Sequence, residues 1–183
     1  MTIQIKSLLL FALASVVFAA SAQAGSDVFL HIDGVRGESQ DQNHRDEIDV
    51  LGWSWTMSSS TEAPTGGGGT AGSALVRDIK IRKYTDSATT DLVSMLLSGT
   101  PAGRAVLTVR RRTPSIEFFK VEMEEVVVTR IAQGGERGED DQQTETIALA
   151  FAKFCIEYTE TEIDNSPGPS ERSCWDIGAN KAY

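Results

Sequence analysis

The sequence predicts a mostly β protein, a barrel or sandwich of strands with a single helix. Most of residues 25–183 alternate apolar with polar side chains, the period of half-buried strands. Two of these runs change phase partway, which indicates long strands that bend. Only residues 89–98 have the apolar spacing of an amphipathic helix. One short helix cannot build a core alone, so we expect it to pack on the sheet.

Residues 1–24 predict a secretory signal peptide. Lys6 precedes the almost wholly apolar run Leu8–Ala20, and Ala22–Ala24 has the small residues of a cleavage site. The run is short for a transmembrane helix and wrongly flanked, although an uncleaved anchor is the alternative. We therefore expect an exported protein whose mature part, residues 25–183, is one domain with a sizeable core.

The composition is acidic, with 26 Asp and Glu against 17 Lys and Arg and a formal net charge of −9. A surface of this sign argues against binding nucleic acid or anionic membranes. No second apolar run is long enough to span a bilayer. We expect neither nucleic acid nor membrane insertion.

The long strand Glu47–Met57 is central to the predicted sheet. Its apolar alternation slips by one residue at Leu51-Gly52, where a β-bulge would absorb the extra residue. After the slip, the face predicted to enter the core carries Trp53, Trp55 and Met57.

The other elements follow the same patterns. The helix Thr89–Ser98 can be capped by Asp86 or Ser87 and ends at Gly99. A second phase slip, near Ala152-Lys153, suggests another bulge within one long strand. The remaining predicted strands are Val28–Ile32, Leu75–Tyr84, Gly103–Arg111, Phe119–Ile131, Thr144–Tyr158 and Cys174–Ile177.

Cys155 and Cys174 are the only cysteines. An even number in an exported chain favours one disulfide. In the predicted strands both lie opposite the apolar face, so a hairpin would bring the two sulfurs together on its outer side. The alternative is two separate thiols.

Catalytic patterns are absent from the sequence. His31 and His44 are the only histidines, and each is interpreted as a lone surface residue. A zinc site would need three or four clustered His or Cys ligands. A serine triad would need a G-x-S-x-G turn, which the sequence lacks.

Three further features have a chemical and a plainer interpretation. Gly66–Gly69 is not followed by the Lys and Ser/Thr of a phosphate-binding loop, so a flexible loop is favoured. Glu139–Asp141 lacks the twelve-residue calcium pattern and is interpreted as a solvated loop. Glu122, Glu124 and Glu125 could supply a hydrolytic carboxylate pair, but charges that blunt a sheet edge explain them as well. We predict no catalytic residue, cofactor or metal.

A series of motifs, in order along the chain, resembles the Hcp family, the tube protein of type VI secretion systems. The segments that carry the resemblance are Asp27–Ile32 (DVFLHI), Val35–Ser39 (VRGES), Glu47–Trp55 (EIDVLGWSW), Gly66–Gly69 with Ala71-Gly72, Lys83–Asp86 (KYTD), Gly138–Asp140, Thr144-Glu145 and Trp175–Ile177. Together they extend over nearly all of the mature chain.

The resemblance implies a β-barrel of two sheets with one flanking helix. It implies a hexameric ring, rings stacked into a tube, small effector proteins carried in the lumen, other type VI components as partners, and no enzyme activity. The residues that it would place in a ring-stacking loop are Glu62, Thr65, Gly66, Gly67, Gly68, Gly69 and Thr70.

An alternative function is open at this point. The family's tube protein is loaded from the cytoplasm and needs no signal peptide, whereas this chain begins with the pattern of one. The same barrel could instead be an exported binding module that no longer builds a tube.

Overall fold

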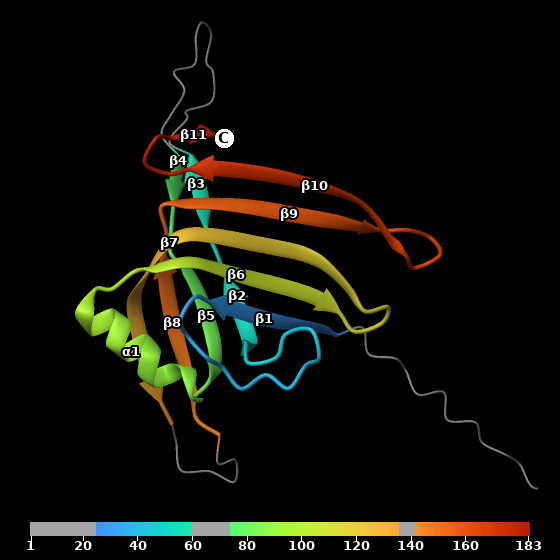
Figure 1. Ribbon diagram of the computed structural model, residues 1–183. Coiled ribbons are helices and arrows are strands. Elements are labelled where there is room, and N and C mark those ends of the chain that lie inside the picture. The colour runs from blue at the N-terminus through green and yellow to red at the C-terminus, as the bar shows by residue number, and fades with distance from the viewer. Residues whose placement is uncertain (1–24, 60–73, 136–141) are drawn as a thin grey trace, which may run out of the picture.

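The computed structural model describes residues 25–59, 74–135 and 142–183, which form eleven strands and one helix (Figure 1). The elements are β1 (Ser26–Ile32), β2 (Ile48–Ser54), β3 (Met57–Ser59), β4 (Ala74–Val76), β5 (Ile79–Tyr84), α1 (Ala88–Ser98), β6 (Ala102–Arg111), β7 (Ile116–Gly134), β8 (Thr144–Ala150), β9 (Lys153–Thr161), β10 (Pro167–Asp176) and β11 (Lys181–Ala182). The predicted mostly β class with one helix is confirmed.

Six strands close into a barrel. Their order is β7-β6-β1-β2-β5-β8, and antiparallel pairing of β8 with β7 completes the circle. On the other side of β7, the strands β9, β10 and β11 extend the sheet beyond the barrel. Closure removes the edges of the six barrel strands and leaves the extension as the exposed margin.

One corner of the barrel is formed by β7 together with the junction of β8 and β9. The 19-residue β7 pairs with β9 as far as Glu124 and with β8 from Val127, while its pairing with β6 extends to Val126. Glu125, at the point where the partner changes, has φ 54°. Next to Glu125, the chain leaves β8 at Ala150 and enters β9 at Lys153. The Ala152 amide donates to the Glu124 carbonyl at 3.0 Å, which joins the β8–β9 junction to β7. The prediction of a single bulged strand over residues 144–158 is wrong, because the chain changes sheets there.

The bulge predicted at Leu51-Gly52 is confirmed by the pairing of β2 with β5, whose register shifts between Val50 and Gly52. The strand ends earlier than predicted, at Ser54, and β3 pairs only with β4. Met57 is 48% exposed, so its predicted place in the core is wrong. It lies on a two-stranded ribbon outside the barrel.

The core fills the barrel with aliphatic side chains from every barrel strand, together with Leu92 of α1. Trp53 and Trp55 pack against this core and are partly buried, as the alternation predicts. Trp53 stacks on Phe119, with ring centroids 5.7 Å apart, and Trp55 meets Phe154 edge-on at 4.8 Å. The aromatics therefore join the barrel core to the extension.

The helix α1 covers one side of the barrel and contacts β7 (Figure 1). Asp86 Oδ1 accepts from the Ala88 amide at 3.0 Å, and Gly99 ends the helix with φ 68°. The prediction of the helix and of its ends is confirmed. Leu97 is 82% exposed, so it does not belong to the apolar face by which the helix packs on the sheet. Within the described ranges, no helix is both long and apolar enough to cross a bilayer.

Candidate assembly surfaces

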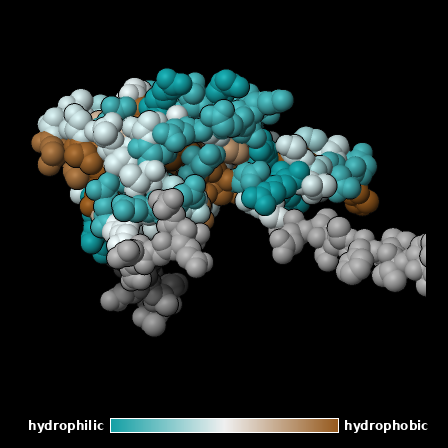
Figure 2. All heavy atoms as spheres, turned by 90° about the horizontal axis from the view of Figure 1, so that it is seen from below, coloured by the Kyte–Doolittle hydropathy of each residue, from teal (hydrophilic) through white to brown (hydrophobic). Residues whose placement is uncertain are grey.

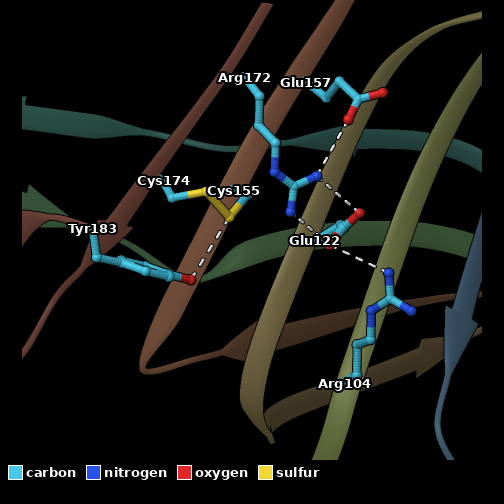
Figure 3. Close-up of a disulfide and its surroundings, with 7 residues drawn as sticks. All are labelled: Arg104, Glu122, Cys155, Glu157, Arg172, Cys174 and Tyr183. Atoms are coloured by element: carbon cyan, nitrogen blue, oxygen red, sulfur yellow. Dashed lines mark hydrogen bonds and ion pairs between the residues drawn. A yellow bond between two sulfur atoms is a disulfide. The ribbon is translucent and has the colours of Figure 1, made fainter.

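The extension formed by β9 and β10 carries the disulfide. Cys155 and Cys174 are directly opposite one another in the two strands, and their sulfurs are bonded at 2.03 Å (Figure 3). The hydroxyl of Tyr183 lies 3.7 Å from Cys155 Sγ. A cross-link between residues 19 apart contributes about 3 kcal/mol in the chain-entropy account. The bond ties β10, which lies near the edge of the sheet, to its neighbour β9.

Ion pairs cover the same outer face of the sheet (Figure 3). Arg172 on β10 lies 3.0 Å from Glu122 on β7 and 3.2 Å from Glu157 on β9, and Arg104 on β6 lies 3.3 Å from Glu122. The hydrogen bond from Arg172 holds the pKa of Glu122 below its usual range. Glu122 is therefore an ionised, paired carboxylate, unlike the raised-pKa acid that a hydrolytic pair requires.

Two exposed apolar side chains lie at opposite ends of the molecule. Leu97 projects from α1 with 82% of its surface exposed, and Ile163 in the β9–β10 turn is fully exposed. Figure 1 places α1 and this turn on opposite sides of the barrel, and Figure 2 shows apolar atoms at both ends of the lower face. Two different ends are what a head-to-tail contact between copies needs.

A buried ionic network lies inside the barrel, where β5 and β8 meet the start of α1. Lys83 and Glu145 are both essentially unexposed, and Lys83 Nζ lies 2.8 Å from Glu145 Oε1 and 2.5 Å from Asp86 Oδ1. Thr89 Oγ1 and Gln133 Nε2 donate to Glu145 at 2.9 and 2.8 Å. The network fixes the helix start against the barrel.

Sequence reasoning missed this network, although the alternation contained a signal for it. Lys83 continues the inward face of Ile79 and Ile81, and Glu145 begins the inward face of Ile147 and Leu149. An ionisable residue on a buried face needs a partner of opposite charge, so the alternation indicates that each of the two residues has such a partner, although it does not say which.

The prediction of a lone surface histidine is wrong for His44. Its side chain is 7% exposed and its ring stacks on Phe29 with centroids 4.1 Å apart. Nδ1 lies 3.0 Å from Glu47 Oε2 and Nε2 lies 3.2 Å from Glu117 Oε1. The loop folds back onto the sheet, a long-range contact that local polarity does not reveal. His31 is exposed, as expected.

The predicted ring-stacking residues Glu62, Thr65, Gly66–Gly69 and Thr70 lie outside the described residues, as does Glu139–Asp141. In the part of the chain that is described, no group of three or more His, Cys, Asp or Glu side chains could hold a metal ion.

Comparison with known proteins assigns the family. A family model described as "Type VI secretion system effector, Hcp" matches residues 29–158. The chain belongs to the Hcp family. The Hcp protein hcp1 of Pseudomonas aeruginosa is 38% identical over 157 residues, which are 84% of this chain and 96% of that protein.

Solved structures of Hcp proteins have the same fold. A structure described as a type six secretion system protein superimposes with a TM-score of 0.82 at 25% identity, over 87% of this chain and all of the other. Hcp1 from Salmonella typhimurium gives a TM-score of 0.73 at 28% identity, over 86% and 99% of the two chains. The Hcp-like barrel expected from the motifs is confirmed.

Proposed function

We propose that this protein is a ring-forming subunit of the type VI secretion tube, assembled as a hexamer whose rings stack and whose lumen carries small effector proteins. The observation that carries the proposal is the Hcp family match over residues 29–158, which takes in most of the barrel and β9. The protein hcp1 of Pseudomonas aeruginosa is covered over 96% of its length.

The two ends of the barrel support a head-to-tail ring. A closed ring of identical subunits joins one surface patch to a different patch on the next copy. Leu97 on α1 and Ile163 in the β9–β10 turn are exposed apolar groups at opposite ends. We propose that these ends belong to the two halves of the contact between neighbouring subunits.

Light scattering on a sizing column tests the ring. Residues 25–183 are expected to elute at about six times the monomer mass. The double variant Leu97→Glu, Ile163→Glu is expected to elute as a monomer, because each contact between neighbouring subunits would have to bury two charged carboxylates. Leu51→Glu, a change at another exposed leucine, serves as the control and is expected to keep the ring. Wild-type protein that stays monomeric at high concentration would contradict the ring and favour the stand-alone binding module.

The segment containing Gly66–Gly69 is proposed to contact the next ring in a stack. Deleting these four glycines is expected to leave the barrel folded and the hexamer intact, and to reduce stacking of rings, because the contacting segment would be too short. Negative-stain electron microscopy at high protein concentration measures tube length, and circular dichroism measures folding. Unfolding of the shortened protein would show that the segment is structural.

Export is a separate part of the proposal. Residues 1–24 have the pattern of a signal peptide, and the disulfide between Cys155 and Cys174 suits an oxidising compartment. We propose that this leader directs the chain out of the cytoplasm, so that its rings assemble outside the inner membrane rather than being loaded from the cytoplasm. The N-terminal sequence of protein recovered from the periplasm tests this point.

A further inference from the structure

The disulfide between Cys155 and Cys174 fastens a part of the chain that has little other packing. We call residues 174–183, which contain the end of β10 and all of β11, the C-terminal hairpin. Within it, Trp175 and Ile177 pack against the core, and β11 pairs with β10 over two residues. A short hairpin at the edge of a sheet is only marginally stable without a cross-link, so this hairpin depends on the disulfide more than a buried element would.

The C-terminal hairpin contacts the ribbon of β3 and β4. Asn180 Oδ1 accepts a hydrogen bond at 3.2 Å from the amide of Ala74, the first residue of β4, at the corner where Figure 1 shows β11 and β4. The ribbon has three residue pairs, and its side chains Met57 and Leu75 are 48% and 45% exposed. Because a two-stranded ribbon of this size is marginal by itself, the contact with Asn180 helps to position it.

The ribbon lies next in sequence to the segment that is proposed above to contact the next ring. Strands β3 and β4 flank residues 60–73, which include Gly66–Gly69. The disulfide holds the hairpin, Asn180 holds Ala74, and β4 pairs with β3. Opening the disulfide would therefore loosen the two strands between which the stacking segment begins and ends.

The surroundings of the two sulfurs favour attack by a thiol at Cys174. Cys174 is partly exposed, whereas Cys155 is buried and its Sγ lies 3.7 Å from the hydroxyl of Tyr183 (Figure 3). A thiolate that attacks Cys174 Sγ expels Cys155 Sγ as the leaving group. A hydroxyl that donates to the departing sulfur stabilises its negative charge, so Tyr183 is placed to speed the opening of the bond.

We propose that the disulfide between Cys155 and Cys174 is a redox switch for ring stacking, closed by oxidation and opened by a dithiol. One thiolate of the dithiol bonds to Cys174 Sγ as the S–S bond breaks, and Cys155 Sγ leaves with the electron pair and takes a proton from water. The second thiol of the dithiol then displaces Cys174, which is protonated in turn. The protein gains two electrons and two protons, and the dithiol becomes a disulfide.

The switch would limit stacking to the exported protein. Thiols are kept reduced in the cytoplasm and are oxidised outside it, so the hairpin would be fastened only after export. The inference rests on the ring stacking proposed above. Release of the hairpin and stacking of rings are therefore measured separately.

Hydrogen exchange and negative-stain electron microscopy of the purified protein test the switch. On reduction with dithiothreitol, the amides of residues 167–183 are expected to exchange up to about 100-fold faster, the factor that the chain-entropy account gives for a loop of this length. Residues 74–76 are expected to exchange faster too, and tubes to become shorter while light scattering still shows hexamers. The double variant Cys155→Ser, Cys174→Ser is expected to match the reduced protein with or without dithiothreitol, which controls for other effects of the reductant.

Asn180→Gly tests the contact between hairpin and ribbon with the disulfide intact. The change removes the acceptor for the Ala74 amide, and glycine tolerates the positive φ of 50° at this position. The oxidised variant is expected to form tubes as short as those of the reduced wild type. Tubes of normal length would show that Asn180 does not transmit the state of the bond, against the proposal.

Tyr183→Phe tests the assistance to the leaving sulfur. Reduction by dithiothreitol, followed by alkylation and mass spectrometry, is expected to be about threefold slower in this variant. Tyr158→Phe removes the hydroxyl of another exposed tyrosine and is expected to react at the wild-type rate. Equal rates in all three proteins would overturn the role of Tyr183.

Equal tube lengths and equal exchange of residues 74–76 in the oxidised and reduced protein would overturn the switch. Unfolding of the reduced barrel, measured by circular dichroism, would overturn it as well, because the bond would then stabilise the whole fold. Oxidised wild type that forms hexamers without stacks would instead contradict the proposed stacking. Exchange at residues 74–76 in those hexamers would still decide whether the bond controls the ribbon.

Discussion

Replacing Glu145 by alanine is expected to lower the free energy of unfolding by about 3–5 kcal/mol. Both members of the pair with Lys83 are buried, and the ammonium lies 2.8 Å from Glu145 Oε1. Removing the carboxylate leaves the Lys83 charge with Asp86 alone and deprives Thr89 and Gln133 of their acceptor. Urea unfolding followed by tryptophan fluorescence measures the change.

Two controls separate the buried charge from the lost side chain. Glu157→Ala removes a carboxylate from an exposed pair with Arg172 and is expected to cost less than about 1 kcal/mol. The double variant Lys83→Met, Glu145→Leu replaces the pair by apolar groups. It is expected to lower the free energy of unfolding by less than the sum of the losses measured for Lys83→Met alone and Glu145→Leu alone. Additive losses would mean that the two charges do not stabilise one another.

The effect of Glu145 is also expected to depend on pH. Burial alone would raise its pKa, but the hydrogen bonds from Lys83, Gln133 and Thr89 and the Lys83 charge bring the pKa below its usual range. A carboxylate whose folded pKa is depressed stabilises fully above its unfolded pKa and loses this contribution as pH falls through the folded value. The difference between wild type and Glu145→Ala should therefore be constant from about pH 6 to 8 and shrink below about pH 4.

Replacing Trp53 by alanine is expected to destabilise the protein by about 3–5 kcal/mol, as the loss of a large packed aromatic does. Trp53 packs against the barrel core and stacks on Phe119 with 15° between the ring planes. The substitution would leave a cavity where β2 of the barrel meets β7. Chemical unfolding monitored by circular dichroism measures the loss.

The neighbouring residue Leu51 provides a matched control. It lies two positions before Trp53 but is 38% exposed, at the bulge of β2. Leu51→Ala is expected to cost less than about 1 kcal/mol, because a solvent-exposed site leaves no enclosed cavity. A loss below about 1 kcal/mol for Trp53→Ala would show that the indole does not contribute to the core.

Much of the fold could be predicted because its signals are local. The bulge in β2 follows from a slip in a period-two pattern, and the ends of α1 follow from Asp86 and Gly99. Strand faces and an even cysteine count favour a bond between Cys155 and Cys174 over two separate thiols, and the structure contains that bond. Each deduction needs only residues that are near in sequence, or two strands joined by a turn.

The corner at Ala152 could not be predicted, because a bulge and a change of sheet produce the same phase slip. Which occurs depends on the neighbouring strand, and here the Glu124 carbonyl of β7 accepts from the Ala152 amide. The prediction for His44 is wrong for a related reason: its polar sequence neighbours indicate a solvent-exposed loop, but Phe29 and Glu117 from distant strands bury it.

Local patterns along the chain specify the mostly β class, the single helix and the resemblance to the Hcp family, since alternation, capping residues and ordered motifs can all be found in short segments. Which side chains face one another emerges from the folded barrel: Lys83 pairs with Glu145 inside it, and His44 meets Phe29 and Glu117. These contacts depend on closure of the sheet. Register between strands distant in sequence sets those neighbours, and no local pattern specifies it.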